Sequence, residues 1–167
     1  MKAVERMEQV LKKALGLRTE KNYGESNQLL QQLAADFPDD PFVHYQCAWS
    51  YDVLGKEAQA VPYYEKAIRL GLQGKDMEGA FIGLGSTYRT LGKYQKSKEV
   101  ITDALEMFPE NRAMQAFLAM ALYNLGDFAK AMELMLTCLT ETSEDEDIKA
   151  YKKALRFYAD KLDQVWE

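Results

Sequence analysis

Apolar residues recur along most of this chain at steps of three and four, the spacing that places side chains on one face of an α-helix. Two such stretches lie between residues 78 and 111, on either side of Gly92. Glycine suits the left-handed conformation that ends a helix, and Pro109 blocks further helix after Phe108. The segment is therefore predicted to form a hairpin of two short helices. Their apolar faces comprise Phe81, Leu84, Gly85 and Tyr88, and then Ser97, Val100, Ile101, Ala104 and Leu105.

The same hairpin pattern returns along the chain. Leu54-Gly55, Leu91-Gly92 and Leu125-Gly126 occupy three turns, whose glycines are 37 and 34 residues apart (92 − 55 and 126 − 92). Lys21 stands 34 residues before Gly55 and takes the matching place in a first copy. Four copies that agree in residue size at fixed offsets indicate a helical repeat of about 34 residues. Small residues stand seven before and five after each turn residue: Ala14, Ala48, Gly85 and Ala119; Ser26, Ala60, Ser97 and Ala131.

This pattern of small, aromatic and proline residues resembles the tetratricopeptide repeat from about Met7 to Glu141. The run from Ala60 to Ala67, followed by Gly71-Leu72 and the run from Leu84 to Arg89, is also similar to a small bacterial subgroup of that family. Three repeats depart from the family pattern early in their first helix, where a large aromatic is usual: they carry Val10, His44 and Gln115.

The expected fold class is all-α, an α-solenoid in which four stacked hairpins form a right-handed superhelix. We expect a single domain over residues 1–167, with repeats at about 7–40, 41–77, 78–111 and 112–143. A capping helix at about 144–166 is predicted to cover the last hairpin. Its stripe of apolar residues comprises Ile148, Tyr151, Leu155, Tyr158, Leu162 and Val165.

Three local features refine this outline. Asp40 before Pro41 predicts a helix start, because aspartate caps the first turn and proline fits its first position. Pro62 lies beyond the first turn of its helix and is expected to bend that helix or delay its start. Residues 71–77 hold the extra length of the second repeat and are expected to form a longer loop.

Composition and charge narrow the classes of partner. The chain is 47% apolar and 28% charged, which are globular values. Its net charge of −5 argues against binding to a nucleic-acid backbone, which needs a basic face. No apolar run approaches the roughly 18 to 20 residues that span a bilayer, and the N-terminal segment lacks the continuous apolar core of a signal peptide. We therefore expect a cytoplasmic protein without a nucleic-acid or membrane partner.

Residue types that carry catalysis or bind metals form no recognisable site. His44 stands on a helix face where other repeats place apolar side chains, so it is expected to be a core or groove residue. Cys47 and Cys138 are expected to be small buried hydrophobes with reduced thiols, not a metal pair. We expect no enzymatic activity, no metal and no cofactor.

The acidic stretch 141–147 has alternating carboxylates, as calcium loops do. It lacks the glycine in mid-loop and the distal glutamate that such loops require. A capping box formed by Ser143 and Glu146 at the start of the last helix explains the stretch better.

In a stack of such hairpins, the first helix of each pair lines the concave surface. The side chains at 13, 10, 6 and 3 positions before each turn residue are free to face that surface. Many of them are apolar or aromatic, which is typical of an interaction site unless superhelical curvature buries them. The candidate groove residues are Leu11, Leu15, Arg18, Phe42, Tyr45, Trp49, Asp52, Ile82, Ser86, Arg89, Met120 and Tyr123.

The leading interpretation is a noncatalytic scaffold that binds a peptide, a helix or a protein surface in this aromatic groove. Relatives that grip acidic C-terminal tails use several Lys, Asn and Arg side chains, whereas this groove offers Arg18 and Arg89, so that mode is disfavoured. The alternative is a self-associating structural protein, a homodimer for example, in which a second copy fills the groove or covers the C-terminal stripe.

Overall fold

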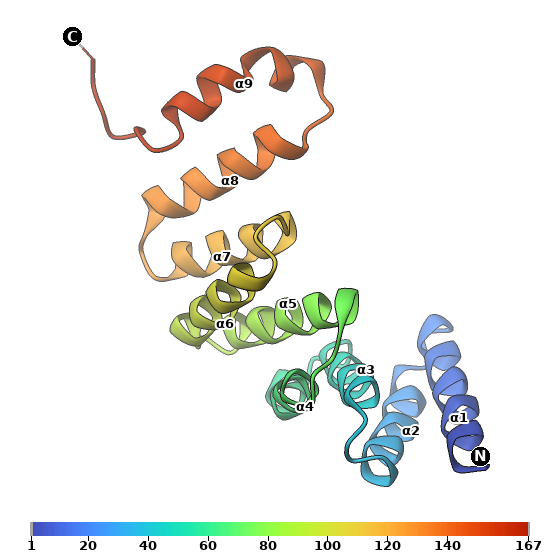
Figure 1. The fold of residues 1–167 in the computed structure, drawn as a ribbon. Helices are drawn as coiled ribbons and strands as arrows, with labels where there is room; N and C mark the ends of the chain where they lie inside the picture. Colours follow the sequence, from blue (N-terminus) through green and yellow to red (C-terminus); the bar gives the residue numbers. More distant parts are fainter. Residues whose placement is uncertain (1, 167) are drawn as a thin grey trace. The chain divides into compact units, whose positions relative to one another are not determined.

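The computed structural model describes residues 2–166, with side chains from residue 4 onward. Within that range the chain forms nine α-helices and no strand, which confirms the all-α class of helical hairpins (Figure 1). None of the helices in this range has both the length and the apolar character that a membrane crossing needs. The helices are α1 (Lys2–Thr19), α2 (Tyr23–Asp36), α3 (Pro41–Asp52), α4 (Glu57–Arg69), α5 (Gly74–Thr90), α6 (Tyr94–Met107), α7 (Arg112–Asn124), α8 (Phe128–Thr142) and α9 (Glu146–Tyr158).

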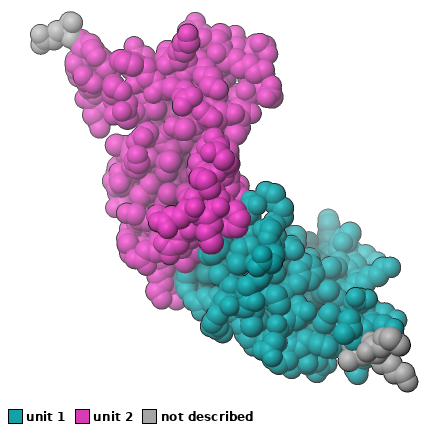
Figure 2. All heavy atoms as spheres, viewed as in Figure 1, with its two compact units in different colours: residues 1–92 teal, residues 93–167 magenta. Residues whose placement is uncertain are grey.

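The helices group into two compact units that meet in sequence at Gly92 (Figure 2). Unit 1 contains α1 to α5, and each helix packs against its neighbour in sequence; α3 also contacts α5. Unit 2 contains α6 to α9, again packed in sequence order. The boundary falls at the predicted turn of the third repeat. The single domain and the superhelix therefore stay predictions.

The turns confirm the register of the repeat. Gly55, Gly92 and Gly126 have φ of 66°, 72° and 85°, the left-handed region that glycine enters without steric cost. Lys21 has a φ of 66° and is the one non-glycine residue with positive φ among those described. Its amide donates to the Arg18 carbonyl at 3.0 Å, as that of Gly55 does to the Asp52 carbonyl at 2.9 Å. The first repeat thus makes the same turn with a lysine in the glycine's place.

Close packing at the predicted small positions is also confirmed. The residues seven before and five after each turn residue are all buried, from Ala14 and Ser26 in the first repeat to Ala119 and Ala131 in the fourth. Ser26 shows how near the helices approach, because its hydroxyl donates to the Ala14 carbonyl across the hairpin at 2.7 Å. A larger side chain at these positions would force the helices apart.

In unit 1, two glycines of α5 pack directly against tyrosine side chains of α3 and α4. A Cβ added to Gly83 would lie 2.5 Å from Cζ of Tyr64, well inside contact distance. A Cβ added to Gly79 would meet the Tyr45 hydroxyl and lie 3.2 Å from its Cζ. These glycines therefore make room for α3 and α4 to pack on α5.

One local expectation is wrong, and so is the delayed start expected of the helix that contains Pro62. The predicted loop 71–77 is shorter, because α5 begins at Gly74, and Asp76 then lies in the first turn, where the helix dipole favours an acid. Pro62 does not delay its helix, which begins at Glu57. Ala58 and Pro62 are both exposed, so water can replace the backbone bond that proline removes. The predicted cap at Asp40 is confirmed, since its side chain accepts from the Val43 amide at 2.8 Å.

The C-terminal helix differs most from expectation. Its N-cap is Asp145, which accepts from the amides of Asp147 and Ile148 at 3.0 and 3.1 Å, so the predicted capping box of Ser143 and Glu146 is wrong. The helix ends at Tyr158 and not near residue 166.

Burial of the last helix is also less than expected. α9 packs against α8, yet none of its residues is buried. Tyr151 is 67% exposed, and Tyr158, Leu162 and Val165 are exposed as well. The predicted stripe therefore covers the last hairpin only in part.

Candidate partner-binding surface

Three aromatic side chains line one face of α3. Phe42, Tyr45 and Trp49 follow each other at helical spacing, with neighbouring ring centroids 6.4 Å apart in both pairs. Tyr45 also packs against Tyr64 of α4 and against Gly79 of α5, so its ring is fixed by three helices. Trp49 lies at the outer end of this row and is 43% exposed. This face is thus fixed by packing at Tyr45, whereas the indole of Trp49 is accessible to solvent.

Arg18 of α1 completes this face. Its guanidinium lies over the Trp49 ring, with Cζ 3.9 Å from the centroid, a cation–π geometry. Its Nη2 donates to Oε1 of Gln46 at 2.7 Å. Its Nη1 is buried and has no hydrogen-bond partner within the described residues. Partial burial lowers the pKa of Arg18, although the group stays charged at neutral pH. We call the set of Arg18, Phe42, Tyr45 and Trp49 the Trp49 surface.

Asp52 was expected in the groove, but its carboxylate is already bonded within the fold. Oδ2 accepts from the Tyr64 hydroxyl at 2.6 Å, and Oδ1 accepts from the Thr87 hydroxyl at 3.1 Å. This one side chain therefore joins α3 to α4 and α5. Burial raises the pKa of Asp52, while the two hydrogen bonds oppose that rise. Its role here is structural.

The remaining candidates are less closely grouped. Leu11, Leu15, Ile82, Ser86 and Arg89 are half-buried residues of unit 1. Met120 and Tyr123 lie in unit 2 and are exposed, with the Tyr123 ring 5.1 Å from Phe128. Among the candidates, the structure thus brings together the four residues of the Trp49 surface.

Sequence reasoning missed Gln46 and the pair of Tyr64 and Thr87. Gln46 lies three residues before Trp49 and is buried. The equivalent positions of the other repeats hold Lys12, Gly83 and Phe117, so the repeat pattern carried no signal that Gln46 is buried beside Arg18. Tyr64 and Thr87 gave no such signal, because their bond to Asp52 joins helices far apart in sequence.

The candidate chemical groups are buried and unreactive. His44 is a core residue: its Nε2 lies 2.8 Å from the Pro38 carbonyl, its ring packs on Tyr63, and burial lowers its pKa. Burial raises the pKa of Cys47 to about 12 and also raises that of Cys138, so both stay thiols. Across residues 4–166, no group of three or more His, Cys, Asp or Glu side chains is arranged to hold a metal ion.

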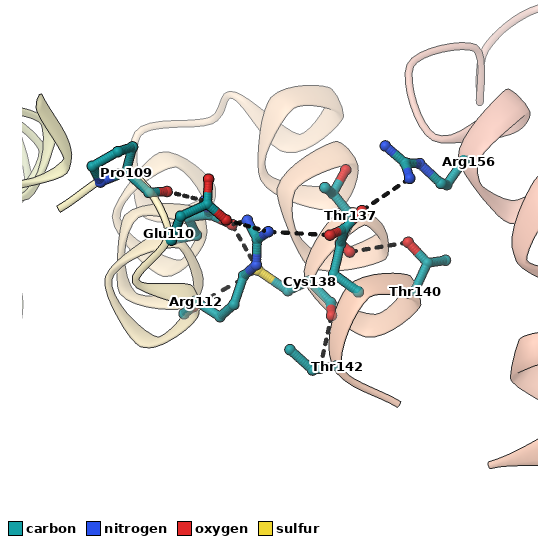
Figure 3. Close-up of polar contacts among 10 residues, drawn as sticks. Pro109, Glu110, Arg112, Thr137, Cys138, Thr140, Thr142 and Arg156 are labelled. Atoms are coloured by element: carbon teal, nitrogen blue, oxygen red, sulfur yellow. Dashed lines mark hydrogen bonds and ion pairs between the residues drawn. The ribbon is translucent and has the colours of Figure 1, made fainter. Parts of the chain in front are cut away.

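Unit 2 contains a polar cluster where α7, α8 and α9 meet (Figure 3). Glu141 accepts from Arg112 of α7 at 3.1 Å and from Arg156 of α9 at 2.9 Å. Arg112 also donates to Gln115, whose Oε1 accepts from the Cys138 thiol at 3.4 Å. These bonds tie the three helices together. The cluster is therefore structural.

Comparison with known proteins places the chain among helical repeat proteins. The sequence model described as "Tetratrico peptide repeat" matches residues 41–162. Superkiller protein 3 of Saccharomyces cerevisiae is 22% identical over 108 residues, which are 60% of this chain and 7% of that protein. The chain thus spans a small part of that relative's length.

Solved structures share the fold at low sequence identity. MamA of Desulfovibrio magneticus RS-1 matches with a TM-score of 0.74 at 16% identity, over 92% of this chain and 85% of that chain. PilF of Pseudomonas aeruginosa matches with a TM-score of 0.70 at 14% identity, over 94% and 70%. YrrB, described as a TPR protein with an unusual peptide-binding site, matches with a TM-score of 0.69 at 19% identity, over 98% and 84%.

Proposed function

Because the chain belongs to the tetratricopeptide repeat family, we propose that it is a noncatalytic protein-interaction scaffold and that a partner peptide binds on the Trp49 surface. The observation that carries this proposal is the exposed indole of Trp49, held between Arg18 and Tyr45. Tryptophan, tyrosine and arginine are the residues most often found at the energetic centre of protein interfaces.

The Trp49 surface is suited to binding because its side chains are already held in place before a partner binds. Tyr45 is wedged against Gly79, and Arg18 is held by Gln46, so the ring and the cation are already fixed beside Trp49. Preorganised groups lose less conformational entropy on association. The exposed part of the indole can then bury an apolar side chain of the partner.

The chemistry of the surface also limits the partner. The charged guanidinium of Arg18 lies beside the exposed indole, so a carbonyl or carboxylate of the partner placed near this cation would be stabilising. One structural neighbour, YrrB, is a TPR protein with a peptide-binding site, which favours a peptide as the class of partner.

A selection with a random peptide library tests this function. The chain is immobilised, and enriched peptides are titrated into a Trp166→Phe variant, in which Trp49 is the remaining tryptophan. We expect a saturable change in Trp49 fluorescence with peptides that carry an apolar residue beside an acceptor group. Enriched peptides that leave Trp49 fluorescence unchanged would contradict the assignment to this surface.

Self-association is the competing function, and light scattering separates it from peptide binding. The exposed apolar side chains of α9, such as Tyr151 and Tyr158, are the observation that favours it. A monomer mass at micromolar concentration supports the scaffold. A mass of two copies that reverts to one in Trp49→Ala would instead assign the Trp49 surface to a second copy.

A further inference from the structure

A second apolar surface lies on α8, in unit 2. Phe128, Met132, Met135 and Leu139 follow each other at steps of four, three and four, so they share one face of the helix. All four are exposed, Phe128 by 59% and Leu139 by 40%. Ala131 and Leu134, which lie beside the stripe on α8, pack on the α7 core. We call the four exposed residues the α8 stripe.

The α8 stripe ends in a pocket beside the C-terminal segment. A pocket of about 460 Å³ lies at the start of α8, with Phe128, Met132 and Leu162 as its apolar walls. The acidic residues Asp127 and Asp163 also line it. α9 packs against α8, yet the four residues of the stripe stay exposed and no residue of α9 is buried.

The charge of the pocket is acidic and uncompensated. Asp163 takes part in no ion pair within the described residues, and Asp127 accepts only the helix-capping bond from the Lys130 amide at 3.3 Å. The cations nearby are already paired, Lys130 with Glu133 at 2.8 Å and Lys161 with Asp160. A ligand that fits this surface therefore combines an apolar face with positive charge at one end.

We propose that the α8 stripe binds an amphipathic helix of a partner protein, whose last turn carries Lys or Arg beside Asp127 and Asp163. Phe128 and Leu139 at the two ends of the stripe are 11 positions apart (139 − 128), roughly 16 Å at 1.5 Å per residue, which matches three turns of a partner helix. Its two methionines can adapt their shape to different apolar side chains. An antiparallel partner helix would place its C-terminal end, where basic residues are favourable, at the acidic pocket.

Two synthetic helical peptides test the proposal. Both carry Leu at matching three- and four-residue steps; one has two Lys in its last turn and the other has two Glu. Anisotropy of a fluorescent label at the N-terminus of each peptide gives the dissociation constant. We expect the Lys peptide to bind at least about ten-fold more tightly than the Glu peptide, and Asp163→Lys to remove or reverse that preference.

Matched variants distinguish binding at the α8 stripe from nonspecific hydrophobic binding. Met132→Asp should weaken binding of the Lys peptide by about 30-fold or more, as expected for a central apolar contact. Met107→Asp places the same charge on another exposed methionine of unit 2, on α6, and should leave binding unchanged. Trp49→Ala should also leave it unchanged, because that residue belongs to the separate surface of unit 1.

The proposal is overturned if both peptides bind alike, or if Met132→Asp binds the Lys peptide as wild type does. It is also overturned if the Lys peptide does not bind while the chain forms dimers that Met132→Asp dissociates, since the occupant is then a second copy. Weakening by Met132→Asp together with a lost or reversed preference in Asp163→Lys supports it.

Discussion

Gly83→Ala tests the packing that fixes the base of the Trp49 surface. The new methyl group would lie 2.5 Å from Cζ and 2.7 Å from Cε1 of Tyr64. The Tyr64 ring has nowhere to move, because its side chain is 2% exposed and its hydroxyl donates to Asp52 at 2.6 Å. The substitution therefore has to push α5 away from α4 or break the bond to Asp52.

The expected loss of folding stability in Gly83→Ala follows from three contributions. Overpacking of a close contact costs about 1–3 kcal/mol. A hydrogen bond to a carboxylate contributes about 1.5–3 kcal/mol and is at least weakened here. Alanine regains about 1 kcal/mol of helix propensity over glycine. We expect a net loss of about 2–3 kcal/mol, or roughly 5–10 °C in melting temperature for a chain of this length.

Circular-dichroism melts of a small set of variants measure this loss. Gly16→Ala is the matched control: no heavy atom lies within 4 Å of its added Cβ, so it should gain up to about 1 kcal/mol. In a Tyr64→Leu background the loss from Gly83→Ala should largely disappear, because the ring it strikes is absent. Equal stability of Gly83→Ala and Gly16→Ala would refute the packing described for α4 and α5.

Three further outcomes are expected. Tyr51→Ala should destabilise by about 3–5 kcal/mol in urea unfolding, because the ring is 9% exposed and packs 5.4 Å from Tyr63. Lys21→Gly should raise the free energy of unfolding by about 1 kcal/mol, since it relieves a left-handed backbone. Folding raises the pKa of Asp52, so the folded state binds this proton more tightly than the unfolded state does. The resulting stability is present at low pH and is lost as pH rises from about 4 toward neutral. Asp52→Asn should therefore flatten the decline of the urea midpoint over this pH range.

The sequence predicted what depends on local spacing. Helix faces and turn positions follow from residues a few places apart, and even the Lys21 turn was found by its offset from Gly55. The small residues at the hairpin crossings were identified in the same way, because each repeat supplies an independent copy of the same contact.

What the sequence did not predict depends on contacts between distant residues. Asp52 looked like a free groove residue, and its bonds to Tyr64 and Thr87 exist only once three helices are packed. The apolar pattern of α9 predicted a cover for α8. An apolar pattern fixes which face of a helix is hydrophobic, however, and not what that face packs against.

The affinity of Trp49→Ala for a library-selected peptide tests the central claim most directly. We expect binding to weaken by about 30-fold or more, while Val53→Ala, also an exposed residue at the end of α3, binds as wild type does. The melting temperature of Trp49→Ala should stay within a few degrees of wild type, because the indole is only partly buried. Unchanged affinity in Trp49→Ala, or unfolding as severe as that of Tyr51→Ala, would contradict a partner-binding role for the Trp49 surface.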